Sequence, residues 1–332
     1  MNSKQLQYFL TTIEQGSITA AARELDVAQP AISLQIANLE HELKTKLFER
    51  DFRGVTLTAA GKLFEHHAHI IFSQIFTAKA ELMQEQEDFK GKVVVGISQA
   101  ACNVLSAVLV TELEHRHPGI SLSFKIGPAH VVDKWLLEKE VDLAICHGSK
   151  VNKIHKNGVL LLKEAISLYI SEQPKNPTFS ELAMYGSIPF EELQNYEIFM
   201  PDEKDTLTQL LNHQASKLGI NLKTKKAFGQ LMTTLHYVTQ GLGLIIAPSS
   251  ATFHLELNQQ LRKIDIVQPS LWRDVYLHIA EKSDQSPAVL AVFELIRETT
   301  ATVHENNTWQ GELIDNHYVR KPEIDIKAMV EG

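Results

Sequence analysis

Basic side chains gather in one short stretch near the start of the 332-residue chain. Of the six basic residues among the first 58, Lys4 and Arg23 stand alone and the other four follow closely: Lys44, Lys46, Arg50 and Arg53. Lysine and arginine bind phosphate oxygens, and such binding depends on where the cations lie rather than on their sum. The same 58 residues hold seven acidic side chains, and the chain has a formal charge of −8. Any affinity for nucleic acid must therefore come from placement.

Just ahead of this cluster, residues 29–43 have the period of a helix with one apolar face. The apolar positions follow at steps of four, three and four: Ile32, Ile36, Leu39 and Leu43. The opposite face carries mostly short side chains: Pro30, Ser33, Leu34, Ala37, Asn38 and His41. Short side chains let a helix lie deep in the major groove, where base edges are read. A helical hairpin in a plain core would show the same spacing, so this pattern leaves both interpretations open.

The segments before this helix indicate how it would be positioned. A first helix is expected from Ser3 to Gln15, and Gly16 ends it. Ser17 is a natural N-cap for a second, alanine-rich helix that ends near Leu25. Pro30 then falls in the first turn of the third helix, where a missing N–H does no harm. The proline therefore marks a helix start rather than a kink, as in a helix-turn-helix.

The segment after the third helix resembles a wing followed by a long helix. A turn at Gly54 precedes the β-type run Val55 to Leu57, and Thr58 can cap a helix that extends to about Asp88. That helix is longer than a globular domain usually needs, and it carries an apolar seam. An antiparallel copy of itself is the simplest partner for the seam, which predicts a dimer.

The residues from Leu6 to Gly61 resemble the LysR-type transcriptional regulators in order and without a gap. The matching positions are Leu6-Gln7-Tyr8-Phe9, Gly16-Ser17, Ala20-Ala21-Ala22, Leu25, Gln29-Pro30-Ala31-Ile32-Ser33, Gln35-Ile36, Leu39-Glu40, Leu43, Leu47-Phe48-Glu49-Arg50, Gly54-Val55 and Leu57-Thr58-Ala59-Ala60-Gly61. The resemblance implies a winged helix-turn-helix, a dimerising linker helix, a C-terminal effector domain and DNA binding as a tetramer. The overall sequence also resembles the nitrogen assimilation control branch.

The resemblance implies which side chains meet double-stranded DNA. Base-facing positions are Gln29, Pro30, Ser33, Leu34 and Gln35, and backbone-facing positions are Arg50, Arg53, Thr56 and Thr58. Two positions depart from the family. Ala28 stands where the family has a capping Ser or Thr, and Leu34 stands where it often has a polar, base-contacting residue. Leucine forms no hydrogen bond with a base but can pack on a thymine methyl group.

Beyond residue 90 the pattern changes to alternating strands and helices. Expected strands lie at 93–97, 120–126, 141–146, 198–200, 222–227 and 244–247, with helices between them, which predicts parallel sheets with right-handed crossovers. Crossing strands are expected at KEAISLYISEQPK and at Val275–Ala280. This pattern predicts an α/β, bilobed, periplasmic-binding-protein-like effector domain that resembles the family's, including GLGLIIAP at Gly241–Pro248.

The predicted domains are a winged helix-turn-helix (1–58), a linker and dimerisation helix (59–90), an effector domain (91–303) and a flexible tail (304–332). Lobe I covers about 91–166 and 270–303, and lobe II about 167–269. Ligands of open α/β sheets bind beyond the carboxyl ends of the strands. The residues expected to line an effector site there are Ser98, Gln99, Ala100, Gly127, His147, Pro201 and Gln230. His147 also suits an ordinary polar loop. The family typically holds a small anion there, but Ala100 stands where a Ser or Thr is frequent.

Other side chains offer fewer functions. Cys102 and Cys146, both near strand ends, suggest a thiol switch or two small buried hydrophobes, and the group of His66, His67 and His69 does not predict a metal site. No cofactor is expected, and no phosphate loop, nucleophile elbow or zinc motif indicates an enzyme. The first residues lack the apolar core of a signal peptide and no window could span a bilayer, so a cytoplasmic protein is expected. The remaining alternative is a solute-binding protein, which fits the two lobes alone.

Overall fold

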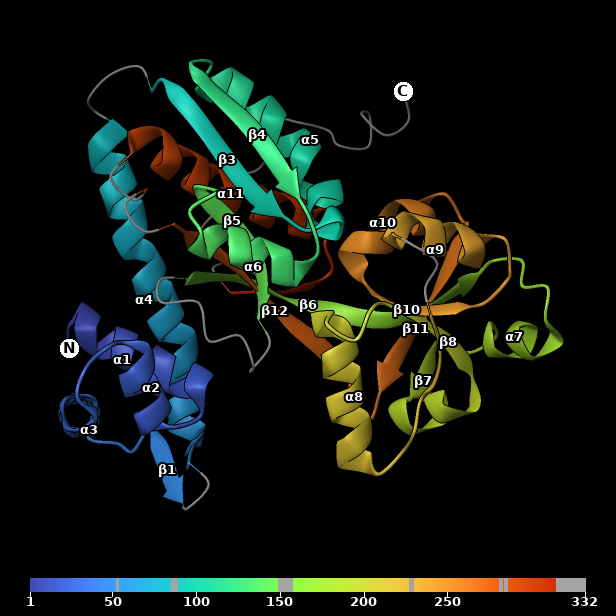
Figure 1. Ribbon diagram of the computed structural model, residues 1–332, viewed down its shortest axis with the longest axis horizontal. Coiled ribbons are helices and arrows are strands. Elements are labelled where there is room, and N and C mark those ends of the chain that lie inside the picture. Colours follow the sequence, from blue (N-terminus) through green and yellow to red (C-terminus); the bar gives the residue numbers. More distant parts are fainter. Residues whose placement is uncertain are drawn as a thin grey trace.

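The chain folds into a small helical domain, one long helix and a larger α/β part. The computed structural model describes residues 1–51, 54–84, 89–148, 158–226, 230–280, 283 and 286–314. Figure 1 shows the helical domain gathered at one end of helix α4 (Ala59–Gln84), with the α/β part beside the other end and extending away from it. Among the described residues, no helix is both long and apolar enough to cross a membrane.

The helical domain has the elements that the sequence predicts. They are α1 (Ser3–Gln15), α2 (Ile18–Glu24), α3 (Gln29–Glu42) and the antiparallel strands β1 (Phe48–Asp51) and β2 (Gly54–Leu57). Gly16 ends α1 with a φ of 65°, a conformation that glycine adopts without strain. The Ser17 hydroxyl accepts from the Ala20 N–H at 3.0 Å and so caps α2. Ala28 precedes α3 and makes no side-chain cap, as its methyl group dictates.

The apolar faces of these elements meet in one core. Phe9 is fully buried and lies against the rings of Phe48 and Phe64, with centroids 5.2 and 4.9 Å apart. Ile32, Ile36 and Leu39 are fully buried, as their spacing predicts. Leu43, expected on the same face, is 36% exposed because α3 ends at Glu42 and Leu43 is its C-cap.

Helix α4 links the two parts. Thr58 starts it by accepting from the Gly61 N–H at 2.9 Å, as predicted. Along its length α4 contacts α1 and β2 at one end and α11 (Pro287–Glu305) farther on. The sequence expected this helix to reach about Asp88, and residues 85–88 lie outside the described residues.

The α/β part is built on one mixed sheet. Its described strands are β3 (Gly91–Ile97), β4 (Ile120–Ile126), β5 (Leu143–Gly148), β6 (Gly158–Ser171), β7 (Ser187–Pro189), β8 (Glu197–Met200), β9 (Lys223–Lys226), β10 (Leu244–Pro248), β11 (Leu261–Val267), β12 (Leu271–Ile279) and β13 (Gly311–Leu313). The principal order is β4-β3-β5-β12-β6-β10-β8-β9. In the first lobe, α5 (Gln99–Arg116) and α11 pack on one face and α6 (Ala129–Leu137) on the other. The other described helices are α7 (Pro177–Leu182), the 3₁₀ helix η1 (Phe190–Asn195), α8 (Thr206–Leu218), α9 (Leu231–Thr239) and α10 (Ser249–Leu257).

The sheet is parallel at each end and antiparallel where the chain crosses between the ends. Strand β3 pairs in parallel with β4 and β5, and β8 pairs in parallel with β9 and β10. We call the part around β3–β5 the first lobe and the part around β8–β10 the second lobe. The long strand β6 runs through both, because its first residues join the apolar core of the first lobe and its last residues that of the second. Strands β11 and β12 line one edge of β6.

The C-terminal residues correct one expectation from the sequence. The flexible tail was predicted from residue 304, but α11 continues to Glu305, Trp309 is fully buried, and β13 pairs with β6 at Leu162–Glu164. Two contacts hold this segment in place: the indole of Trp309 is buried in the first-lobe core, and β13 pairs with β6. The polar composition of the segment gave no sign of either contact in the sequence. The structured part therefore continues to Ile314, and residues 315–332 lie outside the described residues.

Candidate nucleic-acid interface and interlobe polar site

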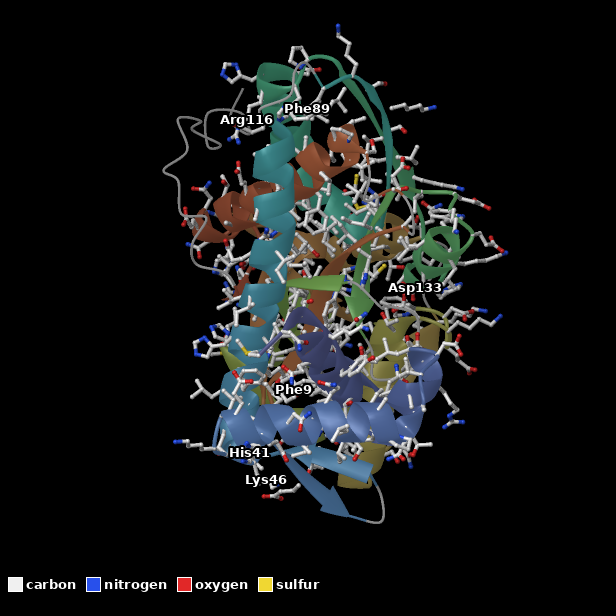
Figure 2. The ribbon with its side chains drawn as sticks, turned by 90° about the vertical axis from the view of Figure 1, so that its left-hand side faces the viewer. Phe9, His41, Lys46, Phe89, Arg116 and Asp133 are labelled. Carbon is white, nitrogen blue, oxygen red and sulfur yellow. The ribbon has the colours of Figure 1, made fainter. Side chains whose placement is uncertain are left out.

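Helix α3 presents one exposed face without a charged side chain over most of its length. Gln29 and Pro30 are exposed at its start, and Leu34 is 59% exposed at its middle. Ser33 and Gln35 are half-buried beside this face. His41, at the last turn, and Lys46 both lie toward the outer end of the domain in Figure 2. The five residues expected to face bases therefore lie on or beside one accessible surface.

A buried carboxylate holds α3 against the hairpin of β1 and β2. Glu40 is 4% exposed and accepts from the Lys46 ammonium at 2.7 Å and from the N–H groups of Leu47 and Phe48 at 2.9 and 3.2 Å. Burial alone would raise the pKa of Glu40, but these hydrogen bonds outweigh it and hold the pKa below its ordinary value. Glu40 was part of the sequence motif, but its role in positioning the hairpin became visible only in the structure.

The hairpin is also fixed against the turn between α1 and α2. The Val55 N–H donates to the Gly16 carbonyl at 3.0 Å, and a Cβ at Gly54 would lie 2.3 Å from that same oxygen. Only glycine allows this close approach. Thr56 is exposed. The Thr58 hydroxyl donates to the Lys46 carbonyl at 2.7 Å while it caps α4, so its polar groups already have partners inside the domain.

Two of the residues expected to contact the DNA backbone are the arginines Arg50 and Arg53. Arg50 belongs to β1, but its side chain lies outside the described residues, as does the whole of Arg53. Their contacts with DNA remain predictions from the sequence.

In the first lobe, parallel strands bring three of the expected effector-site residues to one edge of the sheet. Ser98 follows β3 and caps α5, and its hydroxyl lies 2.9 Å from Nε2 of His147 at the end of β5. Gly127 follows β4, and its N–H donates to the Ile97 carbonyl at 3.1 Å. His147 is a strand residue paired with Val275 and 1% exposed, so the loop interpretation of this histidine is wrong.

The other four expected residues differ in exposure. Gln99 is half-buried, with its amide bonded to Asn103 at 2.8 Å. Ala100 is 5% exposed and belongs to an apolar cluster with second-lobe residues, so its methyl group packs between the lobes. Pro201 is half-buried after β8, and Gln230 is exposed at the start of α9.

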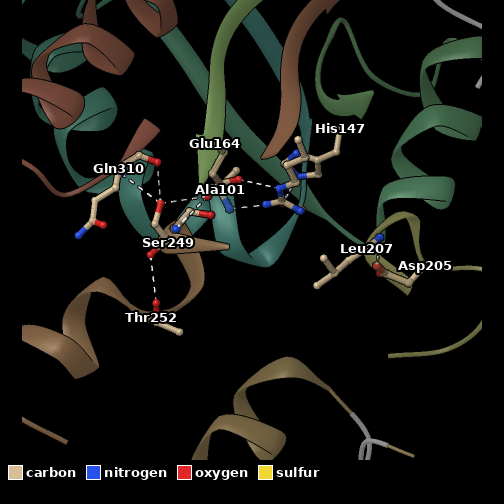
Figure 3. Close-up of polar contacts among 11 residues, drawn as sticks. Ala101, His147, Glu164, Asp205, Leu207, Ser249, Thr252 and Gln310 are labelled. Carbon is tan, nitrogen blue, oxygen red and sulfur yellow. Dashed lines mark hydrogen bonds and ion pairs between the residues drawn. The ribbon is translucent and has the colours of Figure 1, made fainter. Parts of the chain in front are cut away.

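A buried charged pair on the crossing strands lies next to these residues, and the sequence did not reveal it. Glu164 is fully buried and accepts from Arg273 Nε at 2.6 Å and from the Ser250 N–H at 2.9 Å. The Ser249 hydroxyl bonds to the backbone of Gln310, with distances of 3.0 and 3.1 Å to its carbonyl and amide. Figure 3 shows Ser249 and Gln310 on one side of Glu164 and His147 on the other.

This network retains unused hydrogen-bonding capacity. Three of its buried polar atoms have no hydrogen-bond partner among the described residues: Nδ1 of His147, Oγ of Ser250 and Nη2 of Arg273. Burial, and then the charge of Arg273, lower the pKa of His147 well below its ordinary value, which keeps this imidazole neutral. Ser249 and Ser250 directly follow β10. The rule that ligands bind beyond the carboxyl ends of strands, which predicted the other residues, would therefore also have identified these two serines.

The cysteines do not have the environment of reactive thiols. Both are buried, and they belong to different apolar clusters. Burial raises the pKa of Cys102, and burial together with the Asp133 carboxylate raises that of Cys146 well above its ordinary value. Reactive cysteines need a stabilised thiolate and access, so this geometry favours two structural residues. Within the described part of the chain, no group of three or more His, Cys, Asp or Glu could hold a metal ion.

The chain matches known proteins over nearly all of this architecture. Residues 3–62 match the family described as bacterial regulatory helix-turn-helix protein, lysR family, and residues 86–301 match the LysR substrate binding domain. The nitrogen assimilation regulatory protein nac of Escherichia coli K12 is 26% identical over 315 residues, which cover 93% of this chain and 99% of that protein.

Solved structures share the fold. CrgA, a LysR-type transcriptional regulator from Neisseria meningitidis, aligns with a TM-score of 0.60 at 20% identity over 90% of this chain and 99% of its own. The effector binding domain of QuiR in complex with shikimate aligns with a TM-score of 0.54 at 20% identity, over 62% of this chain and 95% of its own. The chain therefore belongs to the LysR family and is a DNA-binding transcriptional regulator with an effector-binding domain.

Proposed function

We propose that α3 enters the major groove of double-stranded promoter DNA and that the hairpin of β1 and β2 acts as a wing on the adjacent backbone. Gln29, Pro30, Ser33, Leu34 and Gln35 then face base edges. Arg50, Arg53 and Thr56 meet the backbone, together with the segment at Thr58. The observation that carries this proposal is the exposed, uncharged face of α3 above a core that fixes its direction.

We further propose that two copies join through the seam of α4 and that two such dimers form a tetramer. The support is the 26-residue length of α4, on which the apolar side chains of Leu63 and Ile75 are 65% and 37% exposed. Since the target is chromosomal DNA, the proposal also places the protein in the cytoplasm.

For the α/β part we propose a periplasmic-binding-protein-like mechanism in which a small molecule binds between the lobes. The site is built from Ser98, Gln99, Gly127, His147, Pro201 and Gln230, with Ala100 packed beside it. The unpartnered atoms of His147, Ser250 and Arg273 support this placement, because buried polar atoms require a partner that water or a ligand would supply. A solute-binding protein is disfavoured as the whole function, because it gives the helical domain no role.

Genome-wide mapping of bound sites tests the regulatory function, since the neighbouring genes would indicate the effector class. Two variants test the docking. Gln29→Ala should weaken binding and relax base preference, because it removes a base contact. Arg53→Ala should weaken binding to all sequences. It should also reduce the slope of log affinity against log salt concentration by about one, because one phosphate contact is lost.

Matched controls lie far from α3. Gln209→Ala and Lys217→Ala remove an exposed glutamine and an exposed basic side chain from α8 and should leave DNA affinity unchanged. Wild-type affinity in both Gln29→Ala and Arg53→Ala would contradict the docking.

A further inference from the structure

Leu34 is a large apolar side chain that the folded domain leaves in solvent. It is 59% exposed, whereas Ile32 and Ile36 on the neighbouring turns of α3 are fully buried. Burying a leucine side chain is favourable, so an exposed leucine on a binding face retains that gain for a partner. Its position on α3 places it within the proposed groove contact.

The side chains next to Leu34 on this face carry no charge. Pro30 and Ala31 lie one turn before it and Ala37 almost one turn after it, all exposed. Ser33 and Gln35, both half-buried, flank Leu34, and Asn38 follows it by one turn, while Gln29 and His41 lie at the two ends. Leu34 is therefore the largest member of a narrow apolar stripe, formed with Pro30, Ala31 and Ala37, that has hydrogen-bonding side chains beside it.

The major groove presents a single kind of apolar group at base level, the C5 methyl of thymine. Cytosine has a hydrogen at the same carbon, and the other groups along the groove are hydrogen-bond donors or acceptors. Leu34 would cover such groups without supplying a partner, and an unsatisfied buried polar group is costly. Both kinds of base pair carry such polar groups, so the methyl is what distinguishes them, and the stripe favours a thymine at this position.

We infer that Leu34 is a specificity-determining residue that reads a thymine C5 methyl in each half-site. This inference rests on the proposed entry of α3 into the major groove. Base recognition at this position then depends on contact with a methyl group. A polar side chain at the same position would recognise the base through hydrogen bonds.

The test removes one methyl at a time. The full chain is first used to select sites from a random-sequence DNA duplex library. Each thymine of the selected site is then replaced by deoxyuridine, which lacks only the C5 methyl. We expect one thymine per half-site at which this replacement weakens wild-type binding about fourfold, the factor that corresponds to one buried methyl group.

Protein variants then test whether Leu34 causes the loss of affinity for the deoxyuridine duplex. Leu34→Ala should bind the thymine and deoxyuridine duplexes equally at that position, because the shorter side chain no longer reaches the methyl. Leu257→Ala, which truncates a leucine that is 64% exposed on α10, should behave like wild type. Replacing the same thymine by 5-methylcytosine should weaken wild-type binding less than replacing it by cytosine does.

Two results would overturn the inference: equal wild-type affinity for thymine and deoxyuridine at every position, or a deoxyuridine effect that persists unchanged in Leu34→Ala. Both would leave the regulatory function standing. Failure of the wild-type chain to enrich any sequence would instead contradict the proposed docking of α3.

Discussion

The carboxylate of Glu164 and the guanidinium of Arg273 form a buried ion pair between two neighbouring strands, with Oε2 and Nε 2.6 Å apart. The two residues are paired in register where β6 and β12 run side by side between the lobes. The second carboxylate oxygen, Oε1, accepts a hydrogen bond from the Ser250 N–H in the first turn of α10, in the second lobe. One side chain therefore ties the crossing strands to the helix that faces α5.

Breaking this pair should be strongly destabilising. Glu164→Gln and Arg273→Met each leave one buried charge without its partner, at a cost of about 3–5 kcal/mol. The double variant should lose less than the sum of the two, because no isolated charge remains. Urea denaturation of the four proteins measures the coupling. Glu172→Gln, which breaks the exposed pair with Arg262, should cost less than about 1 kcal/mol. Strictly additive losses would show that the buried pair is not coupled.

The buried end of α3 gives a second prediction. Glu40→Gln keeps an acceptor for the N–H groups of Leu47 and Phe48 but removes the charge that binds Lys46, so the helical domain should lose about 1–3 kcal/mol. Glu42→Gln changes an exposed carboxylate two residues on and should have a smaller effect. Thermal unfolding of the helical domain is the measurement, and equal midpoints for the two variants would contradict the role of Glu40.

The C-terminal strand β13 gives a third prediction. A Cβ at Gly311 would lie 2.4 Å from the Lys163 carbonyl oxygen, so Gly311→Ala should displace β13 from β6 and accelerate hydrogen exchange of the Ala165 amide. Trp309→Ala should cost about 3–5 kcal/mol, because it empties a fully buried site. Gly186→Ala meets nothing within 4 Å and serves as the control. Unchanged exchange at Ala165 in Gly311→Ala would refute the contact.

The uncapped start of α3 predicts a stabilising change. Ala28 has the extended backbone of an N-cap, with φ −66° and ψ 132°, but no side-chain oxygen. Ala28→Ser should supply one and stabilise the helical domain by about 1 kcal/mol. Ala31→Ser places the same side chain inside the exposed first turn, where serine is a poorer helix former, and should not stabilise. Thermal unfolding distinguishes the two, and a lower midpoint for Ala28→Ser than for wild type would contradict the prediction.

Asp133 predicts a pH dependence. Burial raises the pKa of this carboxyl on α6 to about 6, despite a hydrogen bond from the Cys146 thiol. Between about pH 4, the unfolded pKa, and pH 6 the folded chain holds a proton that the unfolded chain has released. Raising the pH in this window therefore lowers the contribution of Asp133 to stability, by up to about 1.4 kcal/mol per pH unit, and the contribution is constant above it.

Comparison of Asp133→Asn with wild type isolates this contribution. The unfolding free energy of the variant, relative to wild type, should rise from pH 4 to pH 6 and then level off. The unfolding free energy is measured by tryptophan fluorescence during urea unfolding. Trp135 reports on this region because it packs in the same cluster as Cys146. Glu138→Gln, an exposed position after the same helix, should show no such rise. A difference independent of pH would contradict the assignment.

The sequence by itself determined the elements whose signals are local. Gly16, Ser17 and Pro30 predicted the bounds of α1, α2 and α3 because caps and helix starts depend on neighbours within one turn. Apolar runs likewise predicted β3, β4, β8 and β10. The family followed from the order of these same residues, and with it the α3 face that carries Leu34.

Tertiary structure decided what depends on pairing between distant segments. Glu164, Ser249 and Arg273 come from three separate elements and Gln310 directly precedes β13. Their meeting depends on the register of β6 with β12 and on the edge of β6 that β13 covers. The strand β13 itself has only three residues, too few for a periodic signal, and it is held by the buried Trp309. The packing of α5 against the second lobe buries Ala100, which the sequence alone does not show. Local preferences fix where helices and strands begin, whereas long-range packing fixes which polar groups lose water together and must therefore bind one another.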